Sequence, residues 1–243
     1  MTDEEISAGG SRMFRHEPSE EEPELAWGDA ELIEAVSDHV ERHVGPIERV
    51  LHEVVSPVVH IDVLHVAPSD DRPWHTLVTC GMSVKPMLAP EADRAFGELT
   101  LALPPAWPMG DEDWKDERHY WPVRLLKFLA RLPHEYDTWL GNGHTIPNDD
   151  PPRPYARGTR LCGAILAAPL LPPDAFRVLD RPEGPIAFYG VLPLYAAEME
   201  LKLADGADAL YDRLGAAGVT ELVDPGRPGV VEERRRRGLF RRR

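Results

Sequence analysis

Side chains that could bind a metal ion gather in one stretch of the chain. His60 and Asp62 stand two residues apart, and further histidines follow at His65, His75, His134 and His144. On a strand, residues two apart point to the same face, so His60 and Asp62 could offer a nitrogen and an oxygen to zinc or iron. One hypothesis is therefore a metal-binding or hydrolytic enzyme that uses His60, Asp62 and His144.

A simpler interpretation needs no metal. Ten histidines among 243 residues require no special cause, and the His-Glu-x-x-His pattern of a helical zinc site does not occur. Asp62 shares its strand face with Leu64, so its carboxylate is expected to be partly buried and to need a partner. Backbone amides or His60 can donate to it. We therefore predict no metal and no cofactor, and keep the metal site as the alternative.

Nucleophilic chemistry has little support in the sequence. Cys80 and Cys162 each precede a glycine, but nothing in the sequence places a histidine next to either sulfur. Ser83 lies outside any Gly-x-Ser-x-Gly elbow. The run Gly141-Asn142-Gly143-His144 lacks the lysine and the length of a phosphate-binding loop. We predict that the chain is not an enzyme, and that both thiols are reduced, unpaired and poorly reactive.

Large aromatic side chains favour a protein interface. Seven of them lie in or beside loops around a central helix: Trp107, Trp114, Tyr120, Trp121, Tyr136, Trp139 and Tyr155. Trp and Tyr anchor interfaces because they bury a large area and keep a polar group. The alternative is that they cover the sheet as part of the core. The loop over residues 141–148 adds small residues and His144, as expected of a rim that accepts a peptide.

Length and composition indicate one large domain. No linker divides the 243 residues into two complete sets of elements. Residues 1–25 lack the apolar segment of a secretory signal, and no apolar run approaches the roughly 18–20 residues that span a bilayer. Two cysteines supply no disulfide framework. The sequence therefore predicts a cytoplasmic protein without a membrane segment.

The charge is distributed unevenly along the chain. The formal net charge is −15, although seven arginines lie between residues 234 and 243. Without these arginines and the neighbouring Glu232 and Glu233, the chain carries 20 basic and 40 acidic residues, a formal charge of about −20. Such a body is unsuited to nucleic acid and complements a basic protein partner.

Hydrophobic patterns predict short elements, many of them bounded by the 25 prolines. Asp29 is a candidate N-cap for a helix over residues 30–44, and a second helix is expected to open at Trp121-Pro122 and to end or kink at Pro133. Two further helices are predicted over residues 193–203 and 207–214. The predicted strands are 47–55, 58–66, 77–80, 96–103, 160–168, 186–192 and 219–223.

Strands and helices are interleaved without repeated βαβ units. The predicted fold class is therefore α+β (mixed α/β), with one central mixed β-sheet and helices packed on it. Strands 58–66, 77–80, 96–103, 160–168 and 186–192 are expected to join this sheet. We predict a disordered acidic lead over residues 1–26, a domain over 27–228 and a basic flexible tail over 229–243.

Several uncommon sequence words follow one another between residues 46 and 228. They include His60-Ile61-Asp62, Leu77-Val78-Thr79-Cys80-Gly81-Met82-Ser83, Leu103-Pro104-Pro105-Ala106-Trp107-Pro108, Trp139-Leu140-Gly141-Asn142-Gly143-His144, Leu161-Cys162-Gly163-Ala164 and Leu192-Pro193-Leu194-Tyr195. In this order they resemble the suppressor-of-fused domain family. The resemblance implies the same mixed sheet and a protein-binding rather than a catalytic function. The family's best-known animal member binds a transcription factor through an extended peptide, and bacterial members are proposed as immunity proteins that neutralise toxin effectors.

The two most distinctive motifs of this resemblance, around residues 60–83 and around residues 139–148, carry polar residues that their local hydrophobic patterns do not need. A strand end and a Gly-rich loop can meet at one edge of a sheet, where backbone groups remain free for an incoming strand. We therefore predict that Asp62, Thr79, Trp139 and His144 converge on one concave surface that accepts a protein or peptide segment. A basic toxin domain is a candidate partner. The predicted partner-binding residues are Asp62, Thr79, Gly81, Met82, Trp139, Gly143 and His144.

Overall fold

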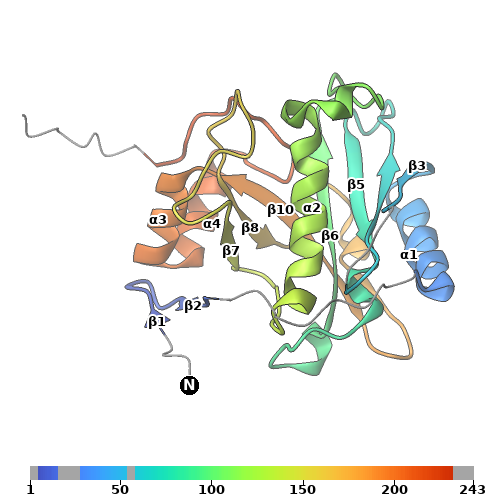
Figure 1. The fold of residues 1–243 in the computed structure, drawn as a ribbon, viewed down its shortest axis with the longest axis horizontal. Coiled ribbons are helices and arrows are strands. Elements are labelled where there is room, and N and C mark those ends of the chain that lie inside the picture. The colour runs from blue at the N-terminus through green and yellow to red at the C-terminus, as the bar shows by residue number, and fades with distance from the viewer. Residues whose placement is uncertain (1–4, 16–27, 54–57, 232–243) are drawn as a thin grey trace, which may run out of the picture.

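One mixed β-sheet forms the centre of the protein (Figure 1). The computed structural model describes residues 5–15, 28–53 and 58–231. Across these residues the strand order is β3-β4-β5-β6-β10-β8-β7, with β9 paired to β10. The strands are β3 (Ile47–Leu51), β4 (Asp62–Val66), β5 (His75–Cys80), β6 (Phe96–Leu103), β7 (Thr145–Pro147), β8 (Gly163–Ala167), β9 (Val178–Leu179) and β10 (Ile186–Leu194). Strands β3 and β7 stand at the two ends of this order and are the edges of the sheet. Strands β6 and β10 run parallel, and the other pairs run antiparallel.

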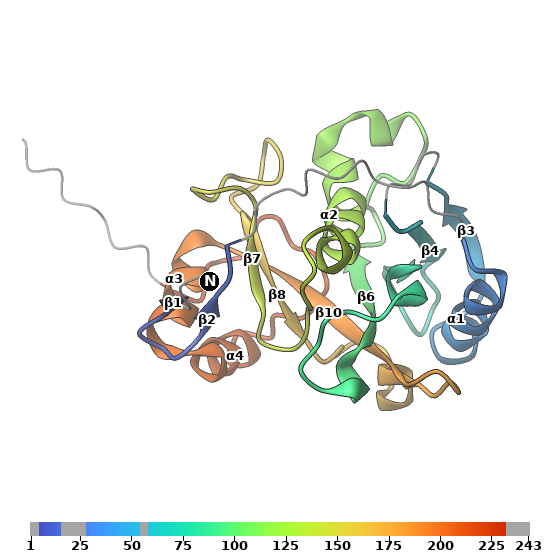
Figure 2. The same cartoon turned by 60° about the horizontal axis from the view of Figure 1, so that its bottom comes forward.

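Helices cover both faces of this sheet (Figure 2). The longest helix, α2, lies on one face, and α1 lies on the other face beside β3, β4 and β5. Helices α3 and α4 pack against each other and against β8 and β10. The helices are α1 (Ala30–His43), α2 (Glu117–Glu135), α3 (Ala196–Asp205) and α4 (Ala207–Ala216), with four 3-10 turns η1 (Met82–Val84), η2 (Ala92–Arg94), η3 (Asp113–Lys115) and η4 (Asp174–Arg177).

Neighbouring side chains on each strand enter different cores. Val63 of β4 and Ala164 of β8 belong to the core beneath α2, here called the α2-side core. Leu64 points to the opposite face and enters a second core with α1, the α1-side core. Ile165 likewise turns away from α2 and packs with α3 and α4. Because strand side chains alternate, α2 covers one face while α1, α3 and α4 share the other.

Both long helices begin at aspartate caps. Asp29 Oδ1 accepts a hydrogen bond from the Leu32 amide at 3.0 Å, which agrees with the predicted cap, and the helix predicted over 30–44 is confirmed over 30–43. Asp116 Oδ1 accepts from the Arg118 amide at 2.9 Å, so α2 begins four residues before the predicted start at Trp121. Pro122 consequently lies in the second turn, where the helix gives up one amide hydrogen bond.

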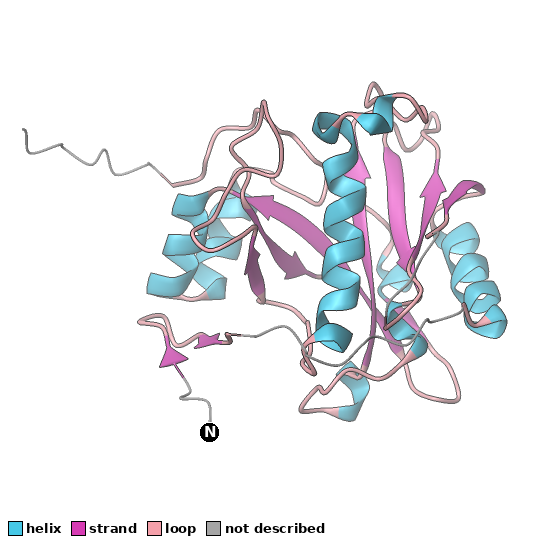
Figure 3. Cartoon of the chain, viewed as in Figure 1, coloured by secondary structure: helices cyan, strands magenta, loops and turns pink. Residues whose placement is uncertain are grey.

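The predicted α+β class is confirmed, and the five strands predicted to join one sheet do so (Figure 3). Strand β6 has the predicted limits, 96–103. Pro193 was a wrong helix start, because β10 continues through Leu194 and α3 begins at Ala196. The strand predicted over 219–223 is present only as an isolated bridge between Leu222 and Ala102.

The first described segment folds although the sequence predicts no element there. Strands β1 (Glu5–Ile6) and β2 (Arg12–Met13) form an antiparallel hairpin, and the Gly9 amide donates to the Leu203 carbonyl oxygen at 2.8 Å. The rest of the predicted lead, the end of strand 47–55 and the arginine-rich part of the tail lie outside the described residues.

None of the helices in the described ranges is both long enough and apolar enough to cross a membrane.

A buried histidine, His65, paired with the partly exposed His75, is expected to make the stability of this fold sensitive to acid. His65 Nε2 lies 2.9 Å from His75 Nδ1, and His75 Nε2 lies 3.3 Å from the Pro105 carbonyl oxygen. The contact between the rings requires at least one of them to be neutral, because one of the two nitrogens must accept. Burial, aided by His75, lowers the pKa of His65 to about 4, and burial lowers the pKa of His75 as well.

We expect the free energy of unfolding to fall as the pH drops from about 6.5 to about 4. Over this range His65 becomes protonated in the unfolded chain but stays neutral in the folded chain. This difference should lower the free energy of unfolding by an amount on the order of 3 kcal/mol. Urea unfolding at pH 7, 5.5 and 4.5 measures it. The variant His65→Gln cannot titrate and should show a shallower loss, and an unchanged pH dependence would contradict the expectation.

Candidate functional site

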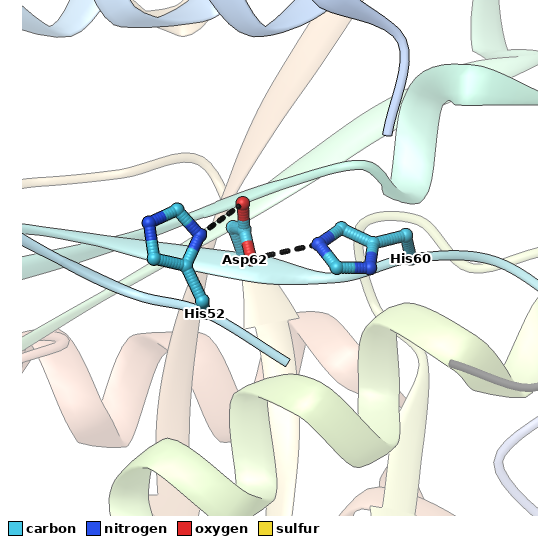
Figure 4. A group of neighbouring side chains, drawn as sticks. All are labelled: His52, His60 and Asp62. Atoms are coloured by element: carbon cyan, nitrogen blue, oxygen red, sulfur yellow. Dashed lines mark hydrogen bonds and ion pairs between the residues drawn. The ribbon is translucent and has the colours of Figure 1, made fainter. Parts of the chain in front are cut away.

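Two histidines and one aspartate meet at the start of β4 (Figure 4). Asp62 Oδ1 lies 3.0 Å from His60 Nε2, and Asp62 Oδ2 lies 3.1 Å from His52 Nδ1. The carboxylate is buried, with 6% of its side chain exposed, whereas the His52 side chain is 72% exposed. His52 follows the edge strand β3, so the cluster joins an edge of the sheet to its second strand. A carboxylate can only accept, so each ring donates an N–H to Asp62.

Backbone contacts and an ion pair hold this cluster. The Glu53 amide donates to Asp62 Oδ1 at 3.2 Å. The Ile61 amide in turn donates to Glu53 Oε2 at 3.3 Å, and the other Glu53 oxygen is paired with Arg131 of α2. The predicted partner for the buried Asp62 carboxylate is therefore present, and it comes from both imidazole rings and a backbone amide.

A groove of about 470 Å³ opens beside the cluster, between residues 52–53 and the outer face of α2. We call it the α2 groove, and it is lined by His52, Glu53, Tyr120, Arg124, Lys127, Phe128 and Arg131. The five helical residues recur at spacings of three and four, which places them on one side of the helix. Three of them are cationic and two are aromatic. Arg131 is paired with Glu53 and Arg124 with Glu117, which leaves Lys127 as the cation of this lining that forms no ion pair among the described residues.

Lys127 has an unusual position in this groove. Its side chain is buried, with the residue 8% exposed, and it forms no hydrogen bond or ion pair with any of the described residues. Burial lowers the pKa of Lys127, while the negative charge of Asp62 acts in the opposite direction. The neighbouring Arg131 keeps a buried Nε without an acceptor in the described part of the chain. Buried cationic groups normally have partners.

The other predicted binding residues lie elsewhere. Trp139 and His144 contact each other edge to face, with ring centroids 4.3 Å apart, and Phe14 of the N-terminal hairpin segment lies 6.5 Å from His144. Burial, together with the charge of Lys202, lowers the pKa of His144 to about 4. The amide of Gly143 donates to the Leu166 carbonyl oxygen at 2.9 Å. This corner precedes β7, at the far edge of the sheet.

The predicted convergence of Asp62, Thr79, Trp139 and His144 on one surface is wrong. Strands β4 and β7 are separated by β5, β6, β10 and β8. Asp62 shares a strand face with Leu64 of the α1-side core, whereas Trp139 packs against the α2-side core. Trp139, Gly143 and His144 lie together at the β7 edge, whereas Asp62 and Thr79 lie on the paired strands β4 and β5. The same separation excludes the metal hypothesis that joined His144 to His60 and Asp62.

Thr79, Gly81 and Met82 have internal contacts. Thr79 donates through Oγ1 to the buried carboxylate of Glu98 at 2.6 Å, and the Gly81 amide donates to the same group at 2.9 Å. The Met82 side chain is fully buried in the α2-side core. Direct contact of these three residues with a partner stays a prediction, since what the structure gives them is a role in the core.

The seven aromatic residues predicted as interface anchors mostly cover the core. All of them belong to the α2-side core or pack against it. Trp121 and Tyr155 stack almost in parallel, with centroids 4.9 Å apart and an interplanar angle of 4°, and both are buried. Tyr120 is the member of this set that lines the α2 groove.

Cys80 and Cys162 are free and buried, as predicted. Burial raises the pKa of both thiols, which disfavours the reactive thiolate. We expect a thiol reagent at pH 7.5 to label both cysteines of the unfolded protein before it labels either one in the native protein. Rapid labelling of the native protein would return a nucleophilic role to consideration.

Sequence reasoning missed His52 and Lys127. His52 was missed because its partner Asp62 lies ten residues further along the chain, on the neighbouring strand. Lys127 was missed because it belongs to an ordinary helical pattern with Arg124 and Arg131. An amphipathic helix with three cations at spacings of three and four was the available signal, and solvation accounts for such a pattern equally well.

The architecture and the groove together describe a class of protein. It is a single mixed sheet with helices on both faces and a groove along one side of α2. Residues 57–228 match the model of the suppressor of fused protein (SUFU) family, and the chain belongs to this family.

Solved structures show the same fold at low sequence identity. A SUFU homolog from Neisseria gonorrhoeae FA 1090 is 15% identical, with a TM-score of 0.62, and the match covers 84% of this chain and 100% of that one. The protein in the crystal structure of a Sufu–Fu complex is 15% identical, with a TM-score of 0.57 and coverages of 86% and 93%. Drosophila Suppressor of Fused is 15% identical, with a TM-score of 0.54, and the match covers 82% of this chain and 50% of that one. A comparison with curated protein sequences found no match.

Proposed function

We propose that the chain acts without catalysis, by binding another protein, and that a segment of this partner lies in the α2 groove. Lys127 carries the proposal, because its largely buried side chain lines the groove and forms no ion pair within the described chain. A partner carboxylate in the groove would supply that ion pair, and Tyr120 and Phe128 would pack against neighbouring apolar side chains. The structure of a relative in a Sufu–Fu complex supports protein binding as the general activity.

We further propose that the partner is a toxin effector and that the chain neutralises it as an immunity protein in the cytoplasm. The formal charge of about −20 before the arginine-rich tail supports this partner class, since many toxins that act on nucleic acid are basic and complementary charge accelerates association. In this scheme the body attracts a basic domain and the α2 groove fixes one acidic segment of it.

Two substitutions in the α2 groove should weaken the complex. Lys127→Met keeps the aliphatic length and removes the charge, and we expect a loss of about 2 kcal/mol, or roughly 30-fold in Kd, for a buried ion pair. Phe128→Ala should cost about 1 kcal/mol, because this ring is 39% exposed and available for contact. Isothermal titration with a basic toxin domain that binds the wild-type chain measures both, and co-expression with that domain tests protection of cell growth.

Leu170→Ala is the matched control, since Leu170 is 53% exposed and lies outside the groove. Trp139→Ala tests the corner of Trp139, Gly143 and His144 as the second candidate surface in the same assay. Protein binding through the α2 groove fails if Lys127→Met and Phe128→Ala both bind like wild type. The toxin assignment fails separately if the chain binds a partner whose toxicity it does not suppress.

A further inference from the structure

We propose that His52, His60 and Asp62 form a binding site for one divalent transition-metal ion of the zinc class. The three side chains offer two imidazole nitrogens and a carboxylate oxygen, and these atoms all lie within 4.8 Å of one another. This donor set suits Zn²⁺ and related ions, whereas Mg²⁺ and Ca²⁺ prefer oxygen ligands. The site does not depend on the proposed protein-binding function.

The observed distances fit an ion after a small movement. Ligands about 2.1 Å from a common ion lie roughly 3.0–3.5 Å from one another. His60 Nε2 lies 3.0 Å from Asp62 Oδ1 and His52 Nδ1 lies 3.1 Å from Asp62 Oδ2, so the two rings meet different oxygens of the carboxylate and one ring must shift, or both oxygens must bind the ion. The separation between the two rings must also come into this range. His52 can make that adjustment because its side chain is 72% exposed. In the absence of an ion the same atoms are joined by N–H to carboxylate hydrogen bonds.

The surroundings of Asp62 prepare it as a ligand. The Glu53 amide orients the carboxylate, and the Arg131–Glu53 pair with the Ile61 amide fixes the backbone on both sides of the cluster. Such outer contacts hold ligands in place and support metal affinity. The positive charge of Lys127 acts on the same carboxylate and opposes an ion, so we expect affinity below that of a closed structural zinc site.

The ligand count indicates an open site. Three protein ligands leave one position of a tetrahedral ion for water or another donor. His52 also lines the α2 groove, so this position is accessible from solvent. The metal ligands considered from the sequence were His60, Asp62 and His144, and the structure has His52 in place of His144. The strand order explains this difference, because His52 directly follows β3, which pairs with β4.

Titration calorimetry on chelator-treated protein tests the site. At pH 7.5 we expect one Zn²⁺ per chain, a rise in Tm with Zn²⁺ and no comparable binding of Mg²⁺. At pH 5.5 binding should weaken strongly, because imidazole ligands must be deprotonated. His52→Gln and Asp62→Asn should each weaken Zn²⁺ binding by more than the roughly 10–100-fold that loss of an outer-shell partner costs.

His144→Gln serves as the control histidine and should bind Zn²⁺ like wild type. His52→Gln is the decisive variant, because an exposed side chain can be replaced without unfolding the domain, and a melting curve without metal verifies this for each variant. The proposal is overturned if wild type binds no Zn²⁺, if binding survives in both His52→Gln and Asp62→Asn, or if it is lost in His144→Gln and kept in His52→Gln.

Discussion

Replacing Glu98 by alanine should lower the free energy of unfolding by about 4 kcal/mol. The residue is fully buried in β6, and burial raises the pKa of its carboxyl group. Oε1 accepts hydrogen bonds from the Gly81 amide at 2.9 Å, the Ser83 amide at 3.0 Å and the Ser83 hydroxyl at 2.6 Å, and Oε2 accepts from the Thr79 hydroxyl at 2.6 Å. Alanine would leave these buried donors without an acceptor and would leave a cavity.

The variant Glu98→Gln separates hydrogen bonding from charge. Its oxygen can still accept the three bonds from Gly81 and Ser83, and its NH₂ group can donate to Thr79 Oγ1, which already accepts from the Leu99 amide at 2.8 Å. We expect it to cost about 1–2 kcal/mol, less than alanine. Glu200→Ala, on the exposed side of α3, is the matched control. Equal stability of Glu98→Ala and wild type in chemical denaturation would contradict this account.

The hydrogen bonds to Glu98 and the close packing of the turn explain why the segment from Thr79 to Ser83 contains hydroxyl residues and a glycine. A β-carbon on Gly81 would lie 2.0 Å from the His60 carbonyl oxygen, and Gly81 has a φ of 126°, a region open chiefly to glycine. The turn therefore packs directly against the backbone that carries the His52–His60–Asp62 cluster. We expect Glu98→Ala to disturb that cluster as well as the core.

Local patterns were sufficient for most of the fold. The Asp29 cap, the alternation over residues 96–103 and the strand runs on either side of residues 67–74 each depend on neighbours in sequence, and each agrees with the structure. The predicted starts of α2 and α3 were wrong, because a proline was taken in each case to mark the beginning of the helix. Asp116 and Tyr195 occupy the cap positions instead, and Pro193 sits within β10.

The candidate site depended on topology that no local pattern contains. The alternation of β4 placed Asp62 on a half-apolar face, and its need for hydrogen-bond partners followed from that. The choice of His52 rather than His144 as a companion follows from the order β3-β4 at one edge and β8-β7 at the other. That order is created by the parallel β6–β10 pair, which joins segments about 90 residues apart.

The largest effect at the C-terminal side of the domain is expected from Arg227→Met, about 3–5 kcal/mol of unfolding free energy. Arg227 and Glu198 form a buried pair with two contacts, Nη2 to Oε2 at 2.5 Å and Nη1 to Oε1 at 2.7 Å, and Glu198 is fully buried. The guanidinium also lies over the Tyr195 ring, 4.7 Å from its centroid. Loss of Arg227 would leave the Glu198 carboxylate buried without a counter-charge.

A double-mutant cycle shows whether the pair itself or its desolvation sets this cost. Glu198 also accepts from the amides of Tyr195 at 2.9 Å and Val230 at 3.0 Å, so Glu198→Leu should be at least as costly as Arg227→Met. The double variant should lose less than the sum of the two, because neither charge is then left alone in the interior. Arg213→Met, at an exposed position of α4, is the control. Strict additivity would mean that the two charges do not stabilise each other, and that the segment ending at residue 231 is held by its backbone contacts instead.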